Sequence, residues 1–222
     1  MKPQSQSLVR IKVDEVTLDG DLALPQDAKG IVLFAHGSGS NRLSPRNRYV
    51  AKELNKAGLG TLLMDLLTAK EEELDVQGQF RFDVDLLSDR LVGATMWLKK
   101  EPAAQNLLIG YFGGSTGAAV ALAAAAKLTD EVHAVVSRGG RPDLAMKYLS
   151  KVKAPTLLIV GGADDRVTGM NEKVFANLAV DKKLEIVPGA RHLFEEPGTL
   201  ETVAELAAEW FSRHLRRGLR YN

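Results

Sequence analysis

A serine stands between glycines where an apolar run gives way to an alanine-rich segment. The stretch is Gly113-Gly114-Ser115-Thr116-Gly117, between "NLLIGYF" and "AAVALAAAAK". Glycine costs folding entropy, so three glycines in five residues imply a backbone that turns sharply or approaches another element closely. The pattern Gly-x-Ser-x-Gly between a strand and a helix is typical of a nucleophile elbow, which exposes the serine hydroxyl above a sheet. The pattern therefore predicts Ser115 as a nucleophile.

A nucleophilic serine needs a base that removes its proton and a third group that orients this base. Of the four histidines, His192 lies in a loop between the last expected strand and the final helix. His133 falls within an expected strand and His214 within an arginine-rich helix, where structural roles are expected. The acid comes from Asp164 or Asp165, after the preceding strand. The resulting chain order is serine, acid, histidine, which is the order expected with this elbow.

Acyl transfer also needs N–H donors for the oxyanion of the tetrahedral intermediate. The backbone N–H of Thr116 lies at the N-terminus of the helix after the elbow, where the helix dipole favours negative charge. A second donor is expected from the loop "HGSGSN", which follows the strand "GIVLFAH". The backbone N–H of Ser38 is the predicted donor in this loop.

Short apolar runs alternate with helical patterns along the chain, which favours an α/β fold with a mostly parallel, twisted sheet of about eight strands and helices on both faces. Two strands, "LVRIKV" and "VTLDGDLAL", form a leading antiparallel pair. Helices are expected over 44–58, 83–100 and 199–218, with Ser44 as a cap of the first. We found no repeat and no linker. Residues 1–222 are therefore predicted to form one domain, with 1–8 as a flexible N-terminal segment.

The composition excludes several classes of protein. The 222 residues are 45% hydrophobic and 26% charged, with a net charge of +1, so no nucleic-acid partner is expected. The chain has no cysteine, which excludes disulfides, thiolate metal sites and a cysteine nucleophile. The scattered histidines argue against a metal site. The sequence has neither a signal-peptide pattern nor a membrane-spanning run, so a cytoplasmic protein without a membrane partner is expected.

The segments "FAHGSGS", "GYFGGSTG", "LLIVGGADDRV" and "VPGARHLFEEPG" resemble those of the α/β-hydrolase superfamily. The small size and the lack of a large cap domain are similar to its dienelactone hydrolase-like branch. This resemblance implies hydrolysis of a small carboxylic ester or lactone, with no cofactor. Dienelactone hydrolases proper have a cysteine at the elbow, whereas this chain has Ser115. A simple esterase is therefore the expectation.

The resemblance also selects one of the two neighbouring aspartates. In similar hydrolases the catalytic acid is followed by two residues and then an apolar residue, commonly valine. The stretch Asp164-Asp165-Arg166-Val167 fits this spacing from Asp164. Consecutive residues of an extended loop point in opposite directions, so Asp165 is expected to face solvent.

Contacts to the substrate are predicted at two places. Arg138 and Arg141 follow a strand at the edge where open α/β sheets bind ligands, and they are candidates for a clamp on a carboxylate, with surface ion pairs such as one to Asp143 as the alternative. Phe80 and Phe82 are candidates for an acyl pocket, with plain packing equally expected, in a charged connection over 68–83 that could fold over the site. The sequence does not indicate the oligomeric state.

Two other functions remain open. Gly37 and Gly39 in a loop after a strand, with Asp65 at the end of the next strand, are similar to part of a dinucleotide-binding fingerprint, although Arg42 stands where the third glycine should be. A non-catalytic binding or regulatory protein with the same fold is the other alternative. The presence of all three predicted triad residues argues against it.

Overall fold

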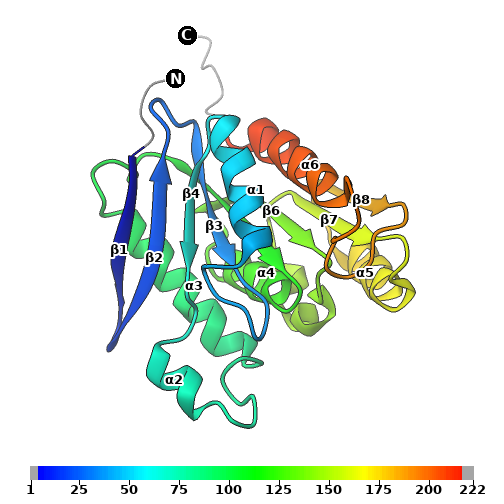
Figure 1. Ribbon diagram of the computed structural model, residues 1–222, viewed down its shortest axis with the longest axis horizontal. Coiled ribbons are helices and arrows are strands. Elements are labelled where there is room, and N and C mark those ends of the chain that lie inside the picture. The colour runs from blue at the N-terminus through cyan, green and yellow to red at the C-terminus, as the bar shows by residue number, and fades with distance from the viewer. Residues whose placement is uncertain (1–4, 217–222) are drawn as a thin grey trace.

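Eight strands form one sheet in the computed structural model, which describes residues 5–216 (Figure 1). The strands are β1 (Ser5–Val13), β2 (Val16–Leu24), β3 (Gly30–Ala35), β4 (Gly60–Met64), β5 (Leu108–Gly114), β6 (Val132–Arg138), β7 (Thr156–Gly161) and β8 (Lys182–Val187). Their order in the sheet is β1-β2-β4-β3-β5-β6-β7-β8. β2 runs antiparallel to both of its neighbours, and the strands from β4 to β8 are parallel. The expected mostly parallel sheet with a leading antiparallel pair is confirmed.

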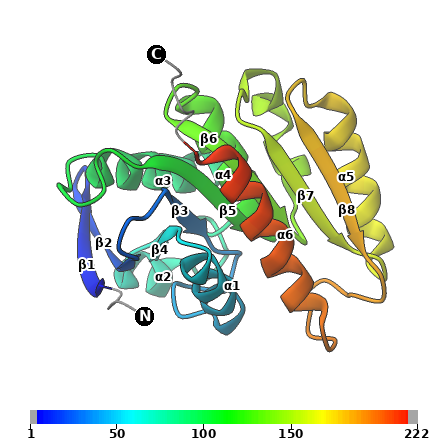
Figure 2. The ribbon, with the colours of Figure 1, turned by 90° about the horizontal axis from the view of Figure 1, so that it is seen from above.

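Helices cover both faces of the sheet, as Figure 2 shows. On one face lie α1 (Pro45–Lys56) and α6 (Thr199–His214). On the other lie α3 (Val84–Leu98), α4 (Gly117–Lys127), α5 (Asp165–Asn177) and the 3-10 helix η1 (Pro142–Lys151). The short α2 (Ala69–Leu74) projects beyond the carboxyl ends of the parallel strands (Figure 1). Within the described residues, no helix has the length and apolar character needed to cross a membrane.

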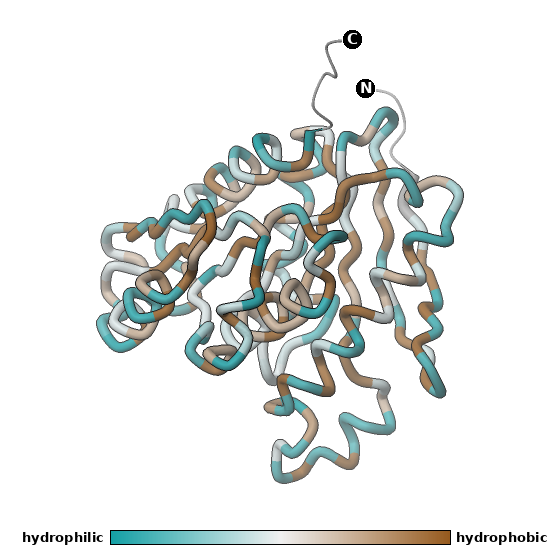
Figure 3. Tube along the Cα trace, turned by 180° about the vertical axis from the view of Figure 1, so that it is seen from behind, coloured by the Kyte–Doolittle hydropathy of each residue, from teal (hydrophilic) through white to brown (hydrophobic). Residues whose placement is uncertain are grey.

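The central strands are apolar without alternation because both of their faces are covered. All six residues of β3 are buried. Val32 and Phe34 pack into the core beneath α1 and α6, whereas Ile31 and Leu33 pack into the core beneath α3 and α4. Figure 3 shows the hydrophobic segments running along the strands and the hydrophilic ones mostly at the loops. Burial on two faces thus explains the continuous apolar runs.

The helix boundaries largely agree with the sequence. Ser44 caps α1, because its hydroxyl accepts a hydrogen bond from the Asn47 backbone N–H, and Gly58 has a positive φ of 80° just beyond the helix. α6 ends at His214, earlier than predicted, and the expected stop at Gly218 lies outside the described residues. Of the segment 1–8 that was expected to be flexible, residues 5–8 belong to β1, and the others lie outside the described residues.

The strand order reverses direction between β3 and β5. After β3 the chain adds β4 on one side of β3, and it then returns to add β5 on the other side. β3 and β5 are therefore neighbours in the sheet, and the connections that follow them lead to opposite edges of the sheet. The carboxyl ends of such a pair are where open α/β sheets bind ligands. This point in the fold is formed by the "HGSGS" loop after β3 and by the serine turn after β5.

Candidate active site

The turn after β5 holds Ser115 in a backbone conformation that few residues other than glycine adopt. Its φ is 52°, which is in the left-handed region. A Cβ atom at Gly113 would lie 2.4 Å from the carbonyl oxygen of Gly117, and one at Gly117 would lie 2.1 Å from the carbonyl oxygen of Ala35. The turn therefore requires glycine at both positions, and it stores strain at the serine, as functional sites often do.

Ser115, His192 and Asp164 lie within hydrogen-bond reach of one another. The Oγ atom of Ser115 is 3.2 Å from Nε2 of His192, and Nδ1 of His192 is 3.0 Å from Oδ2 of Asp164. The imidazole is partly exposed, while 18% of the Asp164 side chain is accessible. The carboxylate thus fixes the tautomer that carries a proton on Nδ1, and Nε2 is left as the base that faces the serine.

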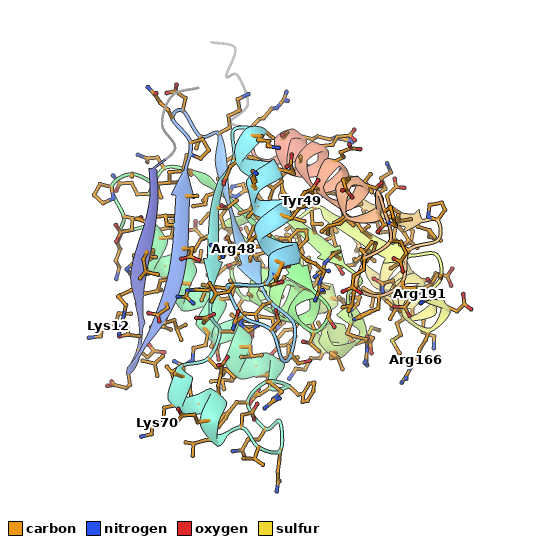
Figure 4. The ribbon with its side chains drawn as sticks, in the orientation of Figure 1. Lys12, Arg48, Tyr49, Lys70, Arg166 and Arg191 are labelled. Carbon is orange, nitrogen blue, oxygen red and sulfur yellow. The ribbon has the colours of Figure 1, made fainter. Side chains whose placement is uncertain are left out.

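Backbone contacts tie the acid loop to the histidine loop. The Ala163 N–H donates to the Ala190 carbonyl at 2.9 Å, which holds the residues before Asp164 against those before His192. Asp165 lies in the exposed first turn of α5. Arg166, also in that turn, and Arg191, beside the histidine, project outward from the molecule (Figure 4). These contacts position one aspartate, Asp164, at the imidazole.

One of the two predicted oxyanion donors already has a hydrogen-bond partner in the structure. The Ser38 N–H is not free, because it donates a hydrogen bond to Oγ1 of Thr116 at 2.8 Å. The backbone N–H of Thr116, the other predicted donor, makes no hydrogen bond within the described residues. The glycine-rich loop does approach the nucleophile, since a Cβ atom at Gly37 would lie 3.7 Å from Oγ of Ser115. No feature of the sequence indicates the contact of the Thr116 hydroxyl with Ser38.

The other histidines have structural surroundings. Nδ1 of His36 bonds to the Gly37 carbonyl oxygen at 3.0 Å, and Nε2 accepts the Leu66 N–H at 3.1 Å, so this ring joins the ends of β3 and β4 as a neutral imidazole. Burial lowers the pKa of His36 and outweighs the raising effects of the Gly37 hydrogen bond and the Asp65 charge. His133 lies in β6, and His214 packs against Trp210 in α6.

A cavity of about 230 Å³ lies beside the glycine-rich loop. It is lined by residues 36–41 together with Glu72, Asp75 and Arg81 of the segment over 68–83. That segment therefore approaches the glycine-rich loop, and its folding over Ser115 stays a prediction. Only some of its acidic residues are exposed to solvent, because Asp75 is 1% exposed and Glu71 pairs with Arg90.

Asp75 organises the turn that follows α2. Its carboxylate accepts the backbone N–H groups of Phe80 and Arg81 at 2.8 and 3.1 Å and the Arg81 Nε–H at 2.6 Å. Burial acts to raise the pKa of Asp75, but these hydrogen bonds and the Arg81 charge outweigh it and hold the pKa below its usual value. The charged form of Asp75 therefore stabilises this wall of the cavity.

Asp75→Asn is expected to lower the midpoint of thermal unfolding at pH 7 and to make Arg81 accessible to trypsin. The amide cannot accept all three hydrogen bonds. Because the folded-state pKa of Asp75 is lowered, its contribution is present at neutral pH and is lost as the pH falls below about 4, where the wild type and the variant should converge. Glu73→Gln, on exposed α2, is the control and should change neither measurement. Equal trypsin resistance of Asp75→Asn and wild type would contradict this role.

Phe80 and Phe82, the two residues predicted for an acyl pocket, differ in their burial. Phe80 is half-buried and packs against the core beneath α3 and α4, which supports plain packing for this residue. Phe82 is 58% exposed and lines a shallow groove with Ser38 and Gly39. Contact of Phe82 with a substrate stays a prediction.

The two arginines predicted as a clamp have different partners. Arg141 binds Asp143 through two hydrogen bonds of 2.9 Å, which is the ion pair that the sequence left open as the alternative. Arg138 is 7% exposed, and its nearest hydrogen-bond acceptor is Oδ1 of Asn47 at 3.5 Å. A Cβ atom at Gly114 would lie 2.5 Å from Nη2 of Arg138, so this guanidinium lies directly beside the serine turn.

The surroundings of Asp65 argue against a dinucleotide site. The backbone N–H of Arg42 donates to Oδ1 of Asp65 at 2.8 Å, and Nη1 of Arg42 is 3.3 Å from Oδ2. The carboxylate that would bind a ribose is therefore already occupied. In addition, the glycine loop after β3 does not lead directly into a helix, since α1 starts only at Pro45.

Comparisons with known proteins agree with this fold. The model of the dienelactone hydrolase family matches residues 18–216. The crystal structure of a dienelactone hydrolase from Anabaena variabilis is 58% identical and has a TM-score of 0.94, with 96% of this chain and 99% of that chain covered. Est1E from Butyrivibrio proteoclasticus is 17% identical with a TM-score of 0.79, covering 93% of this chain and 98% of its own, and this likeness supports the fold alone.

Two curated relatives carry a different name. Both are Mycobacterium tuberculosis proteins named "Putative phosphoribosyl transferase", and each is 52% identical over 213 residues. The match covers 96% of this chain but 47% of those proteins, so the chain spans about half the length of these relatives.

Proposed function

The chain belongs to the dienelactone hydrolase family, and we propose that it is a serine hydrolase that cleaves a carboxylic ester or lactone of a small substrate. The hydrogen-bonded series from Ser115 to His192 to Asp164, with distances of 3.2 and 3.0 Å, is the observation that carries the proposal. It joins a nucleophile, a base and a group that orients the base. The cytoplasmic location expected from the sequence stays a prediction.

Acylation begins when Oγ of Ser115 attacks the ester carbonyl carbon while Nε2 of His192 accepts the hydroxyl proton. Asp164 stabilises the imidazolium that forms, and the Thr116 N–H donates to the oxyanion. Collapse of the tetrahedral intermediate breaks the bond to the alkoxy oxygen. His192 gives its proton to the departing alcohol, which leaves an ester of Ser115.

Deacylation repeats these steps with water. Nε2 of His192 takes a proton from a water molecule while the oxygen of that water attacks the acyl carbonyl carbon. The second tetrahedral intermediate collapses, the acid leaves, and the proton returns to Oγ of Ser115. Each turnover therefore consumes one ester and one water and releases one alcohol and one acid. In a lactone the acid and the alcohol remain parts of one product.

The names of the longer relatives do not change the proposal. Phosphoribosyl transfer is attributed to proteins of which this chain matches 47%. The alternative of a non-catalytic protein predicts the same fold with no turnover. A panel of p-nitrophenyl esters of rising acyl length distinguishes the hydrolase from the non-catalytic protein, because a hydrolase releases p-nitrophenolate continuously and a binding protein does not.

We propose that Arg138 binds an anionic group of the substrate. Burial and the nearby Arg46 charge lower the pKa of Arg138 to about 10, so its guanidinium remains charged at neutral pH. No carboxylate pairs with it within the described residues, and its Nε atom has no hydrogen-bond partner there. A buried cation without a counterion favours an anionic ligand.

Arg138→Gln is expected to lower kcat/KM for the p-nitrophenyl monoester of succinic acid about tenfold or more relative to p-nitrophenyl acetate, since a hydrogen bond to a charged group is lost. Steady-state kinetics on the two esters measure this ratio. Arg141→Gln is the matched control and should change the ratio less, because Asp143 already binds that guanidinium. An unchanged ratio in Arg138→Gln would exclude the proposed contact.

A further inference from the structure

Thr116 occupies the cap position of α4 but does not cap the helix. A threonine at such a position usually accepts a hydrogen bond from an N–H of the first helical turn. Here the side chain makes no such bond. Its Oγ1 atom instead accepts the Ser38 N–H, 78 residues away in the chain, at 2.8 Å. The hydroxyl is thus directed away from its own helix and toward the loop after β3.

The hydroxyl retains a proton that is not used within the described residues. A threonine hydroxyl has one O–H donor and two acceptor lone pairs. Oγ1 of Thr116 accepts from Ser38 and donates to no described residue, although the residue is only 8% exposed. Buried donors are normally paired, so a buried donor without an acceptor needs an explanation. One explanation is that the acceptor of this proton is present only during turnover.

The position of this hydroxyl meets the requirement for such a donor. Thr116 directly follows Ser115, and Ser38 directly follows Gly37. Gly37 lies close to the nucleophile, because a Cβ atom added to it would be 3.7 Å from Oγ of Ser115. The hydrogen bond from Ser38 to Thr116 therefore connects the two segments that border the serine hydroxyl. A carbonyl attacked by Ser115 must place its oxygen near these segments.

We propose that the side-chain hydroxyl of Thr116 is the second oxyanion donor and replaces the Ser38 N–H in that role. The inference rests on the proposed hydrolase function. Thr116 then supplies two donors, its backbone N–H and its O–H. Ser38 is a positioning residue, because its N–H fixes and polarises the hydroxyl that contacts the oxyanion. Hydrogen bonds arranged in series strengthen one another in this way.

Thr116→Val tests the proposal, because valine has nearly the same shape but no hydroxyl. Loss of one oxyanion donor costs about 100-fold or more in kcat. We expect a loss of this size on p-nitrophenyl acetate, with KM changed by less than about threefold, since the donor acts mainly in the transition state. Thr116→Ser retains the hydroxyl and should keep kcat within about tenfold of wild type. A direct role of the Ser38 N–H predicts the opposite for Thr116→Val, an unchanged or higher kcat.

Inhibition by a trifluoromethyl ketone, similar in size to p-nitrophenyl acetate, supplies a second measurement. It forms a tetrahedral adduct with the serine, so its inhibition constant should rise in Thr116→Val by about the factor by which kcat falls. Equal inhibition of Thr116→Val and wild type would overturn the proposal. Thr95→Val, which removes a buried hydroxyl of α3 bonded to Leu91 and Tyr111 and to no residue of the site, controls for lost stability and should keep kcat. Absence of any ester turnover by the wild type would instead overturn the hydrolase function itself.

Discussion

Replacing Ser115 by alanine is expected to abolish ester hydrolysis, with a loss of turnover on the order of a million-fold, as for other triad serines. The variant lacks the oxygen that attacks the substrate, while His192 and Asp164 keep their positions. Initial rates on a p-nitrophenyl ester, measured with purified protein, give the result. A remaining rate above about a tenth of wild type would exclude Ser115 as the nucleophile.

The fold should tolerate this change. Alanine at position 115 has the same Cβ as serine, so the strain at the positive φ of 52° is unchanged. The midpoint of thermal unfolding should therefore stay close to that of wild type. Ser137→Ala is a matched control in the neighbouring strand β6, because its buried hydroxyl has no hydrogen-bond partner within the described residues. This control should keep full activity.

The architecture was predictable because its signals are local or strictly periodic. The continuous apolar runs of the central strands follow from burial on two faces. The helix expected over 83–100 forms over Val84–Leu98, and the helical spacing of Leu87, Leu91 and Leu98 places all three in the core. Ser44 predicted the start of α1 correctly, because a capping side chain acts on its own stretch of backbone.

What the sequence did not predict depends on contacts between distant segments. The Thr116 hydroxyl is a natural helix cap by sequence, and only the approach of the loop after β3 gives it another partner. Arg138 ends β6 and lies beside Asn47 of α1, which is 91 positions away in the chain, so its surroundings could not be predicted from the neighbouring residues. Asp75 lies in a charged run, and its burial requires the turn that follows it.

The largest other effect is expected from Asp164→Asn, which should lower turnover by several orders of magnitude. Oδ2 of Asp164 is 3.0 Å from Nδ1 of His192. An amide in this position can present an N–H to the ring, which favours the tautomer with the proton on Nε2 and leaves no base facing Ser115. Such a change costs about 10⁴-fold in kcat in the serine-protease template.

Asp165→Asn is the matched control, because it makes the same chemical change one residue away. Asp165 lies in the exposed first turn of α5 and makes no hydrogen bond to the imidazole. An exposed charge contributes little, so turnover should change by less than about tenfold. Both variants are measured on one ester at one pH, and their unfolding midpoints are compared to exclude a loss of folded protein. If Asp165→Asn lowers turnover by orders of magnitude and Asp164→Asn lowers it only slightly, the acid of the triad has been assigned to the wrong one of the two neighbours.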